Sequence, residues 1–382
     1  MNRPARRGSI GGGLALISVS AALASCAPGP CPPGWERLEA NLCGWVGGAV
    51  DADDSGAPED GTLRGDLVVE SDADLAGFCA SFERIDGALL VRGTDVGSLA
   101  ALDCLVEVTG DLLIESNPKL EALYLPSLTA VRGALHVNAN GSLRDLSLGG
   151  LTDVGGDLAL DLNEGLAGGA LPALTHVGGE VSVYQNAAFL PVPGGGELDL
   201  SALVAVDRNL FIRLNNSLTR VDLSSLTDVG GMLKLTGNAI LTTLVAPVLE
   251  ETTGLWISYN AALQTFSLPA LHSTGGVTLI RPGLAVLDLP SLEWVHATIE
   301  VTDTVALTTL TMPALTAIDG GLWVHDNPGV SALAFPALGS IVGALQVVRN
   351  PALPTSQAEA LRDVVGVENI GEGVLIEDNA DG

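Results

Sequence analysis

Apolar residues recur along this chain with a period of 22 or 23 residues, from Gly65 to the C-terminus. The clearest copies begin at Gly110, Gly133 and Gly156 and approximate the pattern G-x-L-x-V-x-x-N-x-x-L-x-x-L-x-L-P-x-L-x-x-V. A fixed repeat of this length predicts a solenoid, in which each turn packs against its neighbours. The first apolar residue of each copy, here called the key position, is Leu67, Leu89, Leu112, Leu135, Leu158, Val181, Leu210, Leu233, Leu255, Val277, Ile299, Leu322, Leu345 and Val374.

Each repeat contains three short apolar segments. In the copy at Gly133, Leu135 and Val137 alternate with polar residues, which is typical of a strand with one buried face. Two more segments follow at residues 143–148 and 151–154, and all three are too short for helices. The sequence therefore predicts a mainly β protein, a right-handed parallel β-helix of about 14 turns of 22–23 residues. A leucine-rich-repeat horseshoe is the alternative that the pattern leaves open.

An asparagine lies five residues after most key positions. Asparagine accepts the left-handed backbone conformation, and its side chain can bond to the next asparagine in a stack. We therefore interpret this column as a structural ladder, and we expect two gaps in it, one at Pro282 and one at Thr304. The column comprises Asn117, Asn140, Asn163, Asn186, Asn215, Asn238, Asn260, Asn327, Asn350 and Asn379.

The N-terminus predicts export. Residues 1–25 combine three arginines with an apolar stretch too short to cross a bilayer, as in a lipoprotein signal peptide. The segment Leu23-Ala24-Ser25-Cys26 resembles the bacterial lipobox, which implies that Cys26 is lipidated and anchors the mature chain to a membrane. An ordinary signal peptide is the alternative. We expect an exported bacterial lipoprotein of the outer membrane or cell surface.

Residues 26–64 form a cysteine-containing segment and an acidic linker, and residues 65–382 form the solenoid with a short helix near 356–364, begun by Ser or Thr. Four cysteines besides Cys26 predict two disulfides in an exported chain. Three pairings are possible, and we favour Cys31–Cys43 and Cys79–Cys104. The cysteine spacings contain no C-x-x-C, so we expect no metal site.

The composition narrows the function classes. A formal net charge of −28 disfavours binding to nucleic acid phosphates. The sequence lacks the motifs G-x-S-x-G, H-E-x-x-H and the P-loop, so we expect neither an enzyme nor a cofactor. The alternative is a polysaccharide-cleaving β-helix enzyme, for which Asp157 and Asp161 are the nearest approach to a carboxylate cluster.

Aromatic residues make up only 4% of the chain, so those predicted to face outward are informative. Exposed aromatic side chains are typical of recognition surfaces. The alternative is that another segment, such as the N-terminal one, covers them. The candidate binding residues on the outward side of the first strand of each repeat are Tyr184, Phe211, Arg213, Lys234, Trp256, Trp323 and His325.

The phrases V-x-G-x-L-x-V, N-x-x-L-x-x-L-x-L and P-x-L-x-x-V resemble the receptor L domain of the insulin and epidermal growth factor receptors and its relatives in bacterial lipoproteins. The resemblance covers about residues 65–382 and implies a sheet face that binds a ligand rather than a catalyst. No ligand-contact residue of the receptors has a counterpart here. We expect a non-catalytic binding or adhesion scaffold for an unknown protein or glycan; a purely structural envelope protein is a further alternative.

Overall fold

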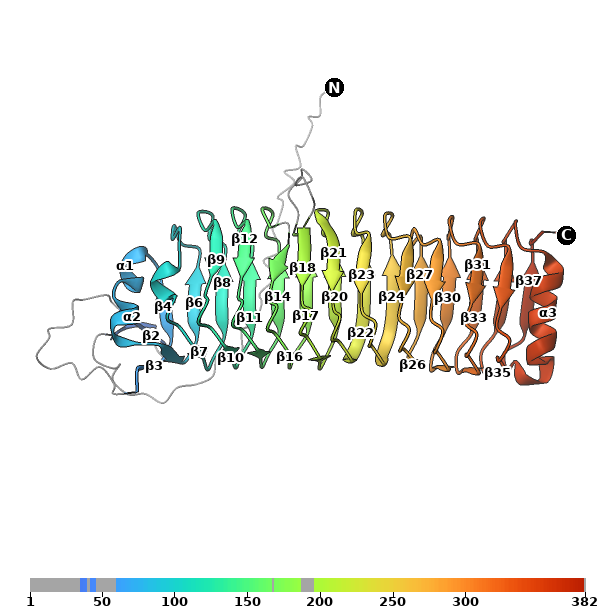
Figure 1. Ribbon diagram of the computed structural model, residues 1–382, viewed down its shortest axis with the longest axis horizontal. Coiled ribbons are helices and arrows are strands. Elements are labelled where there is room, and N and C mark those ends of the chain that lie inside the picture. Colours follow the sequence, from blue (N-terminus) through green and yellow to red (C-terminus); the bar gives the residue numbers. More distant parts are fainter. Residues whose placement is uncertain (1–34, 40–41, 46–59, 167, 187–195, 381–382) are drawn as a thin grey trace, which may run out of the picture.

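The computed structural model describes residues 35–39, 42–45, 60–166, 168–186 and 196–380. Parallel strands stack along one axis into a straight rod (Figure 1). Helices α1 (Asp72–Leu75) and α2 (Phe78–Ser81) lie at its N-terminal end, and α3 (Thr355–Val365) lies at its C-terminal end. The predicted mainly β, parallel β-helix is confirmed, and the straight axis differs from the horseshoe alternative.

The first face contains one strand from every repeat. Each key position pairs with the next one in register, as in Leu135 with Leu158. Two steps are longer, at 29 residues, from Val181 to Leu210 and from Leu345 to Val374, and they keep the same register. The fourteen strands are β4 (Leu67–Val69), β6 (Leu89–Arg92), β8 (Leu112–Glu115), β11 (Leu135–Asn138), β14 (Leu158–Asp161), β17 (Val181–Tyr184), β20 (Leu210–Arg213), β22 (Asp228–Thr236), β24 (Glu251–Ser258), β27 (Val277–Ile280), β30 (Ile299–Thr302), β33 (Leu322–His325), β36 (Leu345–Val348) and β37 (Val374–Glu377).

The third segment of each repeat forms short strands, here called the third face, that belong to the same 25-stranded sheet. In β22 and β24 this segment and the first-face segment of the next turn are one continuous strand. The separate short strands are β3 (Thr62–Arg64), β5 (Arg84–Asp86), β7 (Glu107–Val108), β10 (Ala130–Val131), β13 (Asp153–Val154), β16 (His176–Val177), β19 (Ala205–Val206), β26 (Ser273–Thr274), β29 (Trp294–Val295), β32 (Ala317–Ile318) and β35 (Ser340–Ile341).

The second face is divided into three sheets. The first contains six strands: β9 (Ala122–Tyr124), β12 (Asp145–Ser147), β15 (Gly169–Ala170), β18 (Gly196–Asp199), β21 (Leu218–Asp222) and β23 (Thr243–Val245). The others are the pairs β25 (Thr265–Ser267) with β28 (Val286–Asp288), and β31 (Thr309–Thr311) with β34 (Ala332–Ala334). The pairing of this face therefore stops after β23 and again after β28.

Inward side chains of the three faces form one continuous aliphatic core, from Leu63 to Ile370. Leu135 and Val137 are fully buried, as their alternation predicts. Each such side chain contributes roughly 1.5–3 kcal/mol on burial. A turn buries this core only against its neighbours, so the ends need covers, and Ala358, Leu361 and Val365 of α3 supply one.

The asparagines form a buried hydrogen-bonded ladder. The backbone N–H and Nδ2 of Asn140 donate to Oδ1 of Asn163 at 3.0 and 3.2 Å, and Nδ2 also donates to the carbonyl oxygen of Ile114 at 2.8 Å. One detail of our expectation is wrong, because the left-handed residue is the one before each asparagine. Ala139 and Leu162, for example, have φ of 55° and 60°. That conformation directs the asparagine side chain inward to the ladder.

The ladder has one gap rather than the two expected. Thr304 donates its N–H and its hydroxyl to Asn327 and so restarts the column after Pro282, which has no side-chain hydrogen-bonding group. Thr94 begins the column in the same way by donating to Asn117. A threonine can thus replace an asparagine as the first donor of a ladder.

Both ends of the rod have additional structure. Cys79 of α2 and Cys104, which follows the 3-10 helix η1 (Ala100–Leu102), form a disulfide. Cys31 lies outside the described residues, so the Cys31–Cys43 bond stays a prediction. The expected Ser or Thr cap of α3 is not formed, since Pro354 holds the cap position and Thr355 donates its hydroxyl to Ala380. The remaining elements are the antiparallel pair β1 (Trp35–Glu39) and β2 (Leu42–Trp45), and η2 (Val367–Asn369).

Candidate functional site

Five of the seven candidate binding residues gather on the outward side of four consecutive first-face strands. Strand register places Tyr184 beside Arg213, and Lys234 beside both Phe211 and Trp256. All five are partly buried. We call this set, Tyr184, Phe211, Arg213, Lys234 and Trp256, the aromatic-cationic patch.

The cations of the patch lie over its rings. The Arg213 guanidinium carbon is 5.2 Å from the centre of the Tyr184 ring and 5.0 Å from that of Phe211. The Lys234 ammonium nitrogen is 4.4 Å from the centre of the Trp256 ring. These distances are within the range of cation–π attraction. The indole nitrogen of Trp256 donates to Ser258 Oγ at 3.0 Å, which fixes the ring on its strand.

The two cations of the patch have no carboxylate partner. Among the described residues, nine other lysines and arginines form ion pairs with Asp or Glu, whereas Arg213 and Lys234, like Arg144 and Arg208, form none. Nε of Arg213 is buried and, in the described part of the chain, has no hydrogen-bond partner. The patch therefore places two cations together without a carboxylate of the described residues at ion-pair distance. The charge of Arg213 still acts on Asp161, two strands away, where it lowers the pKa of that carboxyl against the larger effect of burial.

Trp323 and His325 form a separate patch on β33. It lies three strands beyond Trp256, about 14 Å along the axis at the usual strand spacing. Nε1 of Trp323 and Nε2 of His325 are buried without a hydrogen-bond partner among the described residues. Burial, together with the charge of Arg349, lowers the pKa of His325. The candidate residues thus form two clusters rather than one continuous stripe.

The two candidate catalytic carboxylates are far apart. Asp157 precedes β14 and Asp161 ends it, so the strand rise separates their Cα atoms by about 13 Å. Asp157 accepts the N–H of Glu180 at 2.7 Å, as Asp111 accepts that of Ala134. Asp157 therefore belongs to a structural series of contacts between turns.

Asp161 lies on the outward side of the first face, beside Tyr184. The hydroxyl of Ser182 donates to both of its oxygens, at 2.9 and 3.2 Å. Burial raises the pKa of Asp161, and this effect outweighs the hydrogen bond from Ser182, which lowers it. Within the described ranges, no group of three metal-ligating side chains gathers here or elsewhere.

A line of charged side chains on the third face was not predicted from the sequence. His176 bonds through Nδ1 to Asp153 at 3.3 Å and through Nε2 to Asp207 at 3.0 Å. The hydrogen bond to Asp207, and that to Asp153, raise the pKa of His176. The 23-residue step from Asp153 to His176 was visible in the sequence, but the third-face alternation is too short to assign outward positions.

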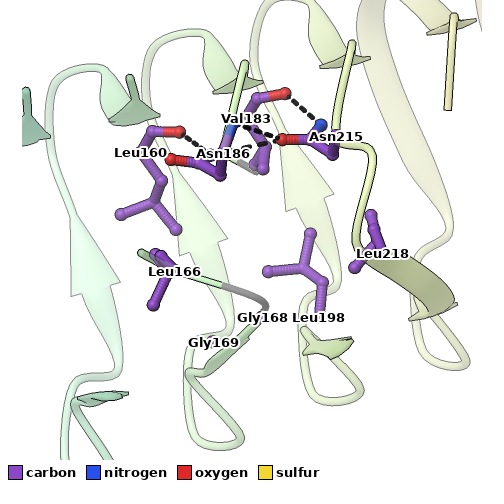
Figure 2. A pocket seen from close by; sticks show the side chains of 9 residues that line it. All are labelled: Leu160, Leu166, Gly168, Gly169, Val183, Asn186, Leu198, Asn215 and Leu218. Atoms are coloured by element: carbon purple, nitrogen blue, oxygen red, sulfur yellow. Dashed lines mark hydrogen bonds between the residues drawn. The ribbon is translucent and has the colours of Figure 1, made fainter. Parts of the chain in front are cut away.

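Two cavities lie away from the patch. An open groove of about 840 Å³ follows the corner between the first and second faces, where Arg281 pairs with Asp303 and Arg349 with Asp326. A small internal cavity of about 10 Å³ lies where Gly169 occupies a position aligned with leucines of adjacent turns (Figure 2). Figure 2 also shows Asn186 and Asn215 of the ladder above it.

No helix among the described residues is long and apolar enough to cross a membrane. Comparison of the chain with protein-family models, curated proteins and solved structures finds no match. The similarity to the receptor L domain thus remains a resemblance between repeat motifs.

Proposed function

We propose that this protein is a membrane-anchored cell-surface lipoprotein that acts as a non-catalytic scaffold for binding a protein or glycan. The observation that carries the proposal is the aromatic-cationic patch. Aromatic and arginine side chains are enriched at binding sites, because they combine a large contact area with directed polar groups. Here they occur together in a chain with few aromatic residues.

The fold supports this role by making the patch rigid. Its strands lie in the middle of a continuously hydrogen-bonded stack, and the Trp256 indole is held by Ser258. A preorganised surface binds with a smaller loss of conformational entropy. The lipobox-like segment ending at Cys26 would hold the rod at a membrane surface.

Binding can be tested with Trp256→Ala in the full-length protein, using a panel of glycans and envelope proteins. We expect Trp256→Ala to weaken the binding of a ligand at least about tenfold. Trp294→Ala is the matched control, since Trp294 is 45% exposed but lies on the third face. Equal binding by the native protein and the Trp256→Ala variant would show that the site is wrongly assigned.

Anchoring can be tested separately. We expect the native chain to incorporate fatty acid and to fractionate with membranes, and Cys26→Ser to abolish the incorporation. Fatty-acid labelling that persists in Cys26→Ser would contradict the assignment of Cys26.

A further inference from the structure

We infer that the ligand of the aromatic-cationic patch is an acidic polysaccharide, whose carboxylate groups contact Arg213 and Lys234. This inference rests on the proposed binding function and specifies its ligand class. It is carried by the local positive charge of the patch, which is opposite in sign to the net charge of −28 that repels polyanions from the protein as a whole, and by the polarity of the outward residues on the neighbouring strands.

Neither cation of the patch has a carboxylate of the described residues within ion-pair distance. The chain has 45 acidic residues against 17 basic ones, so most cations find a carboxylate nearby. Arg213 and Lys234 instead lie against aromatic rings, without an ion pair among the described residues. A ring attracts a cation but does not neutralise it. An external carboxylate would supply the neutralising charge through the partly exposed part of the Arg213 guanidinium.

Carboxylates of the protein bound this positive stretch. Asp161 lies one strand before Tyr184, and Glu300 lies two strands after Trp256. The strands from β17 to β24 therefore present a positive segment about 14 Å long. That length suits several units of a chain that lies along the rod.

The outward residues on the first-face strands next to the patch favour a sugar over a protein as the ligand. The buried centre of a protein interface is usually apolar. The outward neighbours here mostly carry groups that hydrogen-bond to hydroxyls, while the patch supplies aromatic surface. The partly exposed ones are His136, Asn138, Thr236, Thr278 and Thr302, whereas Ser182 and Ser258 are buried and bonded to Asp161 and Trp256.

The full-length protein can be tested with polygalacturonate and with its methyl ester, in which a methyl group replaces the negative charge of each carboxylate. We expect polygalacturonate to bind, and the ester to bind at least about tenfold more weakly. Arg213→Gln and Lys234→Gln should each weaken polygalacturonate binding by a similar factor, and Lys234→Arg should retain it. Lys119→Gln is the control, because Lys119 is the only other lysine and pairs with Asp95.

The outcomes distinguish a wrong ligand class from a wrong binding site. If the ester binds as tightly as the acid and both Gln variants bind normally, while Trp256→Ala does not bind, the inference is wrong and the binding function stands. If Trp256→Ala also binds normally, the proposed site fails as well. If no polyuronate binds but a peptide of residues 46–59 does, the patch is covered by the chain's own acidic linker and the inference is wrong. Thermal unfolding of each variant establishes that it is folded.

Discussion

Thr304 donates both its backbone N–H and its hydroxyl to the side-chain oxygen of Asn327, at 2.9 and 2.7 Å. It therefore joins the asparagine ladder on one side only, because the preceding turn has Pro282 at this position. An asparagine inside the column, such as Asn163, bonds on both sides.

Removal of an interior ladder residue should cost more than removal of the Thr304 hydroxyl. Asn163→Ala removes the acceptor of the buried Asn140 N–H and Nδ2 and the donor to the Val137 carbonyl oxygen, for an expected loss of about 3 kcal/mol. Thr304→Val keeps the backbone N–H and should cost about 1 kcal/mol. Urea unfolding monitored by circular dichroism gives both values. Equal losses would contradict a ladder that bonds both neighbours.

Two adjacent glycines beside the small core cavity should respond oppositely to alanine. A Cβ at Gly169 would lie 3.0 Å from the end of the flexible Leu146 side chain and would fill the cavity. We expect Gly169→Ala to stabilise the protein by about 0.5 kcal/mol, since alanine also restricts the unfolded chain. Gly168→Ala should destabilise it by more than about 1 kcal/mol, because its Cβ would meet the carbonyl oxygen of Glu197 at 2.1 Å. Thermal unfolding of the two variants tests this contrast.

His176 should make stability depend on pH. Hydrogen bonds to Asp207 and Asp153 raise the pKa of His176 in the folded state. The protonated side chain therefore stabilises the folded protein, and this stabilisation is complete below the unfolded pKa near 6.5. That contribution is lost as the pH rises through the higher folded pKa. Since His176 is 39% exposed, we expect at most about 1 kcal/mol.

The measurement is the free energy of unfolding between pH 5.5 and 8.5, for the native protein and for His176→Gln. The advantage of the native protein should shrink towards high pH. Asp207→Asn should reduce the same dependence. A difference between native and His176→Gln that does not change with pH would refute this role.

Reduction of the Cys79–Cys104 bond should loosen the N-terminal end. The bond closes a segment with a sequence separation of 25, which corresponds to roughly 3–4 kcal/mol of loop-closure entropy. Because turns contact only their neighbours, we expect faster amide hydrogen exchange in β3 to β6 of Cys104→Ser and unchanged exchange in β33 to β37. Uniform exchange changes along the rod would contradict this local effect.

The period of the key leucines predicted the strand register, because a one-residue slip would expose every Leu and Val of a strand. The outward candidates followed from the same parity. Their grouping could not be predicted, since cation–π contacts such as Lys234 with Trp256 depend on side-chain conformations. The position of the left-handed residue was also missed. Gly93 and Gly237, with φ of 62° and 70°, occupy this position before Thr94 and Asn238 and were the available signal, but most turns have ordinary side chains there.

Three hydrogen-bonded columns run along the rod: the asparagine ladder, the second-face sheets and the 25-stranded sheet. The first two stop at the same boundary. The ladder has its gap at Pro282, and the second face is unpaired between β28 and β31. Only the first-face sheet, with its short third-face strands, continues across. Under mechanical load this boundary is where the rod should yield first. The aromatic-cationic patch and the pair Trp323 and His325 then belong to different cooperative units. A polymer bound to both would connect the two units across the boundary and resist their separation.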